Sequence, residues 1–150
     1  MQRQTLLRTL VAAGAVAVLA TGCGSMRPSE KIEIFEATLS GAQEVPPVNS
    51  AGSGQAELQW NRNSNVLSWK VTFTGLSGEV TGAHIHGPAP TGANAGVVIP
   101  FMTGISGTIT GQTNLTTQQI ADLNAGRWYV NIHTAANPGG EIRGQITRRM

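Results

Sequence analysis

Residues 54–60 have the sequence GQAELQW, and residues 66–73 have the sequence VLSWKVTF. Apolar and polar residues alternate in both segments, which predicts two β-strands that each have one buried and one exposed face. The residues between them, NRNSN, are typical of a turn. We therefore predict a β-hairpin whose buried face carries Trp60 and Trp69.

Six further segments resemble strands in the same way, and they extend the hairpin in both directions along the chain. They are residues 31–39, 81–86, 97–101, 107–113, 128–134 and 141–147. The sequence NPGG at residues 137–140 predicts a tight turn between the last two. Trp128 also falls on an inward-facing position. Short strands separated by Gly-rich turns predict an all-β fold, an antiparallel two-sheet sandwich.

One short helix is predicted after residue 116. Thr116 and Thr117 are both candidate N-caps, and Gln119 follows Thr116 at the spacing of a capping box. Ile120 and Leu123 form a narrow apolar stripe. Gly126 is a suitable residue for the position just beyond the helix. Because it spans only about two turns, this helix needs tertiary packing to persist.

The N-terminal residues have the pattern of a secretory signal sequence, which we assign to residues 1–22. Arg3 and Arg8 precede an apolar run from Leu10 to Ala20, and LATGC follows at residues 19–23. This segment resembles the lipobox of bacterial lipoproteins, in which the cysteine is lipidated and becomes the first mature residue. We therefore expect an envelope protein that is anchored in a membrane by a lipid on Cys23, with residues 23–30 as a tether to the domain at 31–148. Several acyl chains would make this anchoring stable.

The basic charge of the whole chain comes largely from this signal. Loss of Arg3 and Arg8 reduces the ten Lys and Arg residues to eight, which equals the number of Asp and Glu residues. A basic pair remains at Arg148 and Arg149, but such a pair at the end of a chain is ordinarily solvated. The composition thus gives no reason to expect nucleic-acid binding.

All three histidines of the chain lie in two of the predicted strands. His84 and His86 are in AHIHG at residues 83–87, and His133 is in YVNIHT at residues 129–134. Successive side chains of a strand point to opposite faces. If the aliphatic neighbours of the histidines face the core, the three imidazoles share the outer face. The sequence therefore predicts a possible metal site.

Three imidazoles suit copper, zinc or nickel, and copper(II) binds most tightly in this series. A fourth position would remain open to water or to a ligand. Such a site also needs acceptors that hold the rings in place. We consider four residues for this role, although Glu44 could instead brace a strand beside its two prolines. They are Glu44, Asn131, Glu141 and Gln145. We also expect Arg143, which is a cation and donates rather than accepts, to lie within reach of the His133 side of the site.

Three motifs of the chain together resemble the CHRD domain. They are LSGAQEVPP at residues 39–47, AHIHG at 83–87, and YVNIHT at 129–134 followed by PGGEIRGQI at 138–146. The resemblance covers about residues 32–148. It implies an immunoglobulin-like or superoxide-dismutase-like sandwich, and it implies little about activity.

A weaker resemblance concerns the copper site of Cu/Zn superoxide dismutases. It consists of a His-x-His strand, a later histidine and a near-terminal arginine, which correspond here to His84, His86, His133 and Arg143. The sequence has no fourth histidine to bridge to zinc, no zinc ligand set and no cysteine pair. The resemblance therefore implies a site for a single ion.

Three functions remain open, in the following order. The first is an anchored metal-binding module with one copper ion, and the second is a metal-free domain that binds a protein partner of unknown identity. The third is a copper-dependent oxidoreductase of the dismutase type. The sequence shows neither a Ser/His/Asp arrangement nor a convincing carboxylate pair, so we assign no catalytic residue and favour a protein that is not an enzyme.

Overall fold

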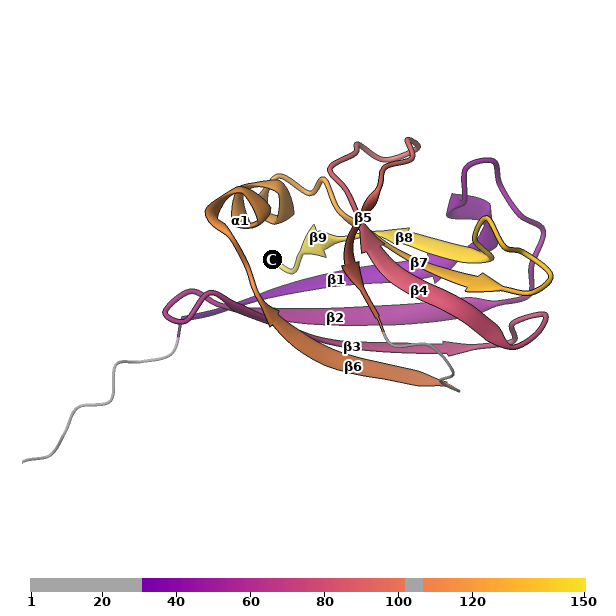
Figure 1. Ribbon diagram of the computed structural model, residues 1–150, viewed down its shortest axis with the longest axis horizontal. Helices are drawn as coiled ribbons and strands as arrows, with labels where there is room; N and C mark the ends of the chain where they lie inside the picture. The colour runs from indigo at the N-terminus through magenta and orange to yellow at the C-terminus, as the bar shows by residue number, and fades with distance from the viewer. Residues whose placement is uncertain (1–30, 102–106) are drawn as a thin grey trace, which may run out of the picture.

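The computed structural model describes residues 31–101 and 107–150, which form a curled antiparallel β-sheet with one helix (Figure 1). The elements in chain order are β1 (Ile32–Ser40), the 3-10 turn η1 (Gly41–Gln43), β2 (Ser53–Asn61), β3 (Val66–Thr74), β4 (Val80–His86), β5 (Val97–Pro100), β6 (Thr108–Asn114), α1 (Thr117–Asn124), β7 (Tyr129–Thr134), β8 (Ile142–Gln145) and β9 (Thr147–Arg148). The signal sequence, Cys23 and the tether predicted above lie outside the described residues.

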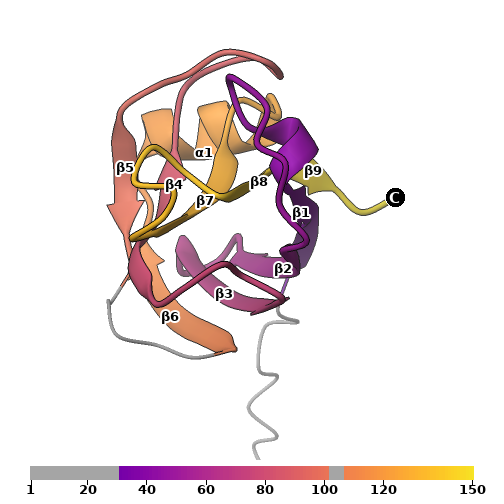
Figure 2. The same cartoon turned by 90° about the vertical axis from the view of Figure 1, so that its right-hand side faces the viewer.

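The sheet has the strand order β5-β4-β7-β8-β1-β2-β3-β6, and β9 pairs with β1. Figure 2 shows the first four strands and the last four as two layers that face each other. The predicted all-β fold with one helix is therefore confirmed, and the two layers are halves of one hydrogen-bonded sheet. The halves meet where β1 pairs with β8, with Ser40 opposite Arg143.

The hairpin that the sequence predicted is formed by β2 and β3, which pair over their whole length with Leu58 opposite Trp69. The inward-facing residues of both strands are buried as expected, apart from Phe73 near the end of β3, which is half-buried. Trp60, Trp69 and Trp128 are at most 9% exposed, so the assignment of all three tryptophans to the core is confirmed. Burial of each such side chain is worth on the order of 2–3 kcal/mol, which makes this alternation the main local determinant of the fold.

The predicted helix is present as α1, and the capping box is complete. The Thr116 hydroxyl accepts a bond from the Gln119 backbone amide, and the Gln119 side chain accepts one from the Thr116 amide. Gly126 has φ of +65°, a conformation that glycine adopts without steric cost just after a helix. In the described parts of the chain, no helix has the length and apolarity required to cross a membrane.

Two loops rise above the β4–β7–β8 layer on its outer side (Figure 1). One comprises residues 41–50 and the other comprises residues 87–96. The side-chain amide of Asn94 donates to the backbone carbonyl of Val45 at 3.0 Å and joins the two loops. The second loop is also fixed at both ends, because the Gly87 amide donates to Gly96 and the Ala89 amide donates to Arg127. These loops cover the face on which the histidines lie.

Candidate metal centre

The three histidines lie together on the outer face of β4 and β7, as strand parity predicted. Ala83, Ile85 and Ile132 point into the core and are fully buried, and the alternate positions carry the half-buried imidazoles of His84, His86 and His133. The two strands are neighbours in the sheet, with Gly82 opposite His133. The register therefore converts a pattern in two separate segments into one cluster.

The ligand nitrogens of the three rings lie within 4.8 Å of one another. His84 Nδ1 and His133 Nε2 are 3.2 Å apart and form a hydrogen bond between the two rings. Two nitrogens that bind one ion tetrahedrally at about 2.0–2.1 Å stand roughly 3.3 Å apart, so this pair already has the required separation. The ring centroids are 5.1 Å apart for His84 and His133 and 5.3 Å apart for His84 and His86.

Backbone carbonyls hold two of the rings and determine which nitrogen can bind an ion. His86 Nδ1 is 3.0 Å from the Ala95 carbonyl oxygen, and His133 Nδ1 is 2.9 Å from that of Pro138. A carbonyl oxygen only accepts hydrogen bonds, so both Nδ1 atoms carry the proton and both Nε2 atoms keep a lone pair. His86 Nε2 is buried and has no hydrogen-bond partner. An unpaired buried nitrogen in a ring held by a carbonyl fits a metal ligand.

The electrostatic environment favours the neutral form of His84 and of His86. Burial lowers the pKa of His84, and the neighbouring His133 and His86 lower it further. Burial also lowers the pKa of His86, while its bond to Ala95 raises it and the charges of His133 and Arg143 lower it. Because only the unprotonated nitrogen can bind an ion, these effects act in the direction that a metal site requires.

Gly82 provides the room in which the His84 ring lies. A Cβ atom at this position would be 3.1 Å from His84 Cε1 and 3.8 Å from His133 Cδ2. Such a contact is tighter than ordinary van der Waals packing, so a side chain here would press on the ring of His84. Sequence patterning did not single out this glycine, although it stands two residues before His84 on the same face of β4.

Glu44 and Asn131 form a buried pair beside the histidines. Asn131 Nδ2 donates to Glu44 Oε1 at 2.7 Å. Asn131 is 3% exposed and Glu44 is 5% exposed. Burial raises the pKa of Glu44 to about 7, although the charge of Arg143 and the bonds from Val45 and Asn131 act against it. Asn131 lies opposite His84 in the β4–β7 ladder. The Glu44 carboxylate bonds to Asn131 rather than to an imidazole.

Glu141 is also fully buried, but it makes no contact with the histidine rings. Its carboxylate accepts bonds from the hydroxyls of Ser50, Ser77 and Thr134 and from the Ser77 amide. Thr134 follows His133 and points to the opposite face of β7. Because β8 begins at Ile142, strand parity does not orient the Glu141 side chain. This side chain joins two loops to the end of β7 and does not hold a ring.

Arg143 contacts the cluster indirectly, through Tyr129. Its guanidinium lies 3.4 Å from the centroid of the Tyr129 ring, and the His86 ring stacks on Tyr129 with centroids 5.0 Å apart at 7°. The Tyr129 hydroxyl also exchanges bonds with the Ala95 backbone. Arg143 is 2% exposed and lies beneath the loop at residues 87–96, where it bonds to Ala93 and Asn94. It therefore supports the site through Tyr129. It does not present its charge to solvent.

The sequence missed the two groups that orient the rings, which are the carbonyls of Ala95 and Pro138. Every residue has a carbonyl, so no residue type could have indicated them. It also missed Tyr129, although this residue stands in the same motif as His133. The alternation of YVNIHT places Tyr129, Asn131 and His133 on one face. This pattern could have indicated that Tyr129 lies beside the histidines.

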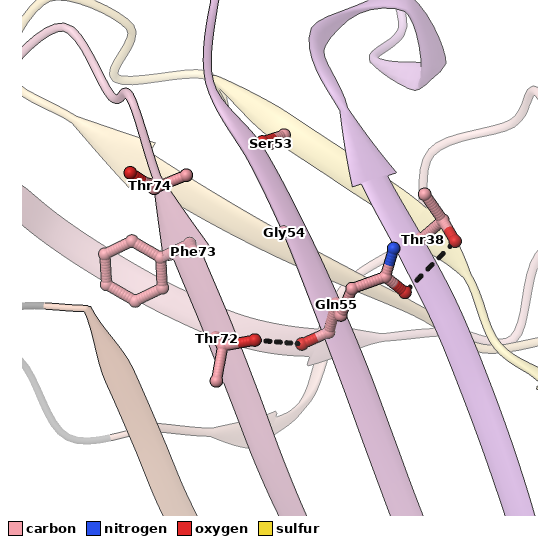
Figure 3. A pocket seen from close by; sticks show the side chains of 7 residues that line it. All are labelled: Thr38, Ser53, Gly54, Gln55, Thr72, Phe73 and Thr74. Carbon is pink, nitrogen blue, oxygen red and sulfur yellow. Dashed lines mark hydrogen bonds between the residues drawn. The ribbon is translucent and has the colours of Figure 1, made fainter.

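A hollow of about 290 Å³ lies on the polar side of the layer that contains β1, β2 and β3. Figure 3 shows Thr72, Gln55 and Thr38 side by side on β3, β2 and β1. Their polar groups are satisfied within the sheet, because Thr38 donates to the Gln55 side chain and Thr72 donates to the Gln55 carbonyl. No residue lining this hollow has a buried, unpaired polar side-chain atom. The histidine cluster is therefore the stronger candidate site.

Comparison with known proteins identifies one family. The model of the CHRD domain matches residues 35–146, which include all three histidines and the strands that carry them. No curated protein and no solved structure matches the chain. The match covers most of the chain and includes each of the motifs that suggested the resemblance. The chain therefore belongs to the CHRD domain family.

Proposed function

We propose that this CHRD-domain protein is a metal-binding module of the cell envelope that holds one copper ion between His84, His86 and His133. The observation that carries the proposal is the buried Nε2 atom of His86, which has no hydrogen-bond partner in a ring already fixed by Ala95. A group of this kind is costly in a folded protein unless it has a ligand to bind.

The donor set supports copper among the available ions. Three neutral imidazoles suit copper, zinc and nickel, and copper(II) has the highest affinity for a given nitrogen site in the divalent series. Three protein ligands leave a position for water or another small ligand. Among the described residues, His84, His86 and His133 form the one cluster of three or more metal-ligand side chains. These residues therefore provide a site for one ion and no site for a second.

Copper uptake tests the proposal directly. The purified full chain is expected to bind about one Cu(II) per molecule in equilibrium dialysis. The double variant His84→Ala with His86→Ala should lose this uptake, because one imidazole alone binds weakly. Unchanged uptake in the double variant would contradict the site, and no uptake by the unmodified protein would favour a metal-free domain that binds a protein partner.

A matched control is available on β2. Gln55→Ala with Gln59→Ala removes two polar side chains, four residues apart, from one exposed strand face. Neither residue contacts the histidines, so this double variant should retain full copper uptake. Thermal unfolding of both double variants in EDTA separates loss of the site from loss of the fold.

We also propose that the protein is held at a membrane by a lipid on Cys23. The support is the signal-like sequence of residues 1–22 followed by a cysteine at the position of lipidation. Cells grown with labelled palmitate should incorporate label into the protein, and Cys23→Ser should remove it. Absence of label from the unmodified protein would contradict the anchor without affecting the proposed copper site.

A further inference from the structure

A cavity of about 360 Å³ lies beside β8, between the loop at residues 41–50 and the loop at residues 87–96. It shares no lining residue with the histidine cluster. The residues that determine its chemistry are Glu44, Val45, Pro47, Thr91, Arg143 and Gln145. Two of these carry opposite charges, and both charged residues are almost completely buried.

Arg143 is a buried cation without a carboxylate bound to it. Its guanidinium donates to the Asn94 side-chain oxygen at 2.9 Å and to the Ala93 carbonyl at 2.7 Å, and it lies over the Tyr129 ring. These partners are all uncharged. None of the ion pairs among the described residues includes Arg143. Glu44 in the same cavity offsets part of the Arg143 charge through space, but the two form no ion pair. Because a buried cation is costly without a bound opposite charge, the cavity favours a ligand that brings an anionic group to Arg143.

The same cavity also has free acceptors. Gln145 donates through Nε2 to the carbonyls of Ala89 and Gly126, which fixes its amide, while its Oε1 atom is buried without a partner. The Glu44 carboxylate accepts one side-chain bond, from Asn131, and has capacity for more. A ligand that satisfies these oxygens must bring N–H donors, and a cationic group satisfies Glu44 best.

The remaining wall is apolar and limits the size of the ligand. Val45 and Pro47 line one side, and Thr91 adds a hydroxyl on the opposite loop. The Asn94 amide ties the two loops together at Val45, so the cavity is formed before a ligand enters. A preformed cavity of this volume accommodates a small molecule with a short apolar body.

We propose that this cavity binds a small zwitterion of the α-amino-acid class. Arg143 binds the carboxylate of the ligand, and Glu44 with the Gln145 carbonyl oxygen binds its ammonium group. An anion alone would leave Glu44 and Gln145 without a donor from the ligand, and a cation alone would use the Glu44 charge and leave Arg143 without a bound carboxylate. The zwitterion is the simplest ligand that satisfies all three groups. This proposal is independent of copper binding.

Titration of the metal-free full chain with L-alanine, followed by NMR, tests the proposal. The titration is run in EDTA at pH 8, where Glu44 is ionised because its pKa is about 7. We expect saturable shifts at the amides of Val45 and Gly92, and at least about tenfold weaker binding of acetate and of methylammonium, because each of these probes lacks one charged bond. Acetate that binds as tightly as L-alanine would overturn the proposal, and so would the absence of saturable shifts with 20 mM L-alanine.

Two variants locate the site. Glu44→Gln keeps the shape of the side chain and should weaken L-alanine binding at least about tenfold. It should not weaken acetate binding, because loss of the Glu44 charge removes a repulsion of the anion. Arg143→Lys keeps the charge but loses the planar fork, and should weaken both L-alanine and acetate. Glu79→Gln, at an exposed position, is the matched control and should bind as the unmodified protein does. L-alanine binding that is unchanged in Glu44→Gln would overturn the proposal, and amide spectra verify that each variant is folded.

Discussion

Replacement of Glu141 by alanine is expected to reduce the free energy of unfolding by about 3–5 kcal/mol. The carboxylate is fully buried and accepts four hydrogen bonds of 2.6–2.8 Å, two from Ser77 and one each from Ser50 and Thr134. The alanine variant leaves these donors buried without an acceptor. Each hydrogen bond to a charged group contributes about 1.5–3 kcal/mol, and the bonds join three segments distant in sequence. The effect should therefore be among the largest for any single substitution.

Urea unfolding at pH 7 measures this loss. Glu79→Ala removes a glutamate from an exposed position and serves as the control, with an expected change within about 0.5 kcal/mol. A loss below about 1 kcal/mol in Glu141→Ala would show that the serine and threonine hydroxyls find other acceptors. Copper uptake by the folded fraction should be retained, because Glu141 makes no bond to the imidazoles.

The same carboxylate predicts a pH dependence of stability. Burial raises the pKa of Glu141, but the bonds from Thr134, Ser50 and Ser77 together outweigh this effect and lower the pKa to about 2. The unfolded chain has the ordinary value of 4.5 and binds more protons than the folded chain between these limits. Stability from Glu141 is thus fully present above pH 4.5 and is lost as the pH falls toward 2. The difference in unfolding free energy between the unmodified protein and Glu141→Gln should shrink over this range, and a constant difference would contradict the assignment.

Replacement of Gly144 by alanine is expected to destabilise the protein by at least about 3 kcal/mol and to lower the melting temperature by about 10 °C. A Cβ atom at this position would be 2.4 Å from the Thr38 carbonyl oxygen and 2.9 Å from the Thr38 carbonyl carbon. Both atoms belong to the backbone of β1, so they cannot rotate away as a side chain would. The clash forces apart β1 and β8, the pair of strands at which the two halves of the sheet meet.

Gly139→Ala is the matched control for this substitution. Gly139 lies in the turn before β8, and a Cβ atom there would have no heavy atom within 4 Å. The control should melt within about 2 °C of the unmodified protein. Equal melting temperatures of the two variants in differential scanning calorimetry would mean that the β1–β8 junction has room for a methyl group.

Local patterns predicted most of the elements and the face on which the histidines lie. The alternation in β2 and β3 placed Trp60 and Trp69 in the core, because a two-residue period is a property of the strand itself. The capping box of α1 was predicted for the same reason, since Thr116 and Gln119 are only three residues apart. Such features depend on neighbours in the sequence.

The support of the candidate site could not be predicted in this way. Glu44 and Arg143 were proposed near the rings, but neither bonds to an imidazole: both line a separate cavity beside the histidines, and Arg143 reaches His86 only through Tyr129. Glu141 was proposed as a support of the rings, and its contacts are Ser50, Ser77 and Thr134. Each of these arrangements depends on how two loops fold over the sheet, and loop conformation has no periodic pattern in the sequence.

The sequence by itself determined the strands, the helix cap and the common face of His84, His86 and His133, because these follow from spacing along the chain. Only the tertiary structure decided that His84 Nδ1 and His133 Nε2 stand 3.2 Å apart and that His86 keeps one nitrogen unpaired. It also decided that one continuous sheet curls into two layers. The physical reason is that strand register and backbone carbonyls fix these distances, and both depend on residues far apart in the sequence rather than on residue type.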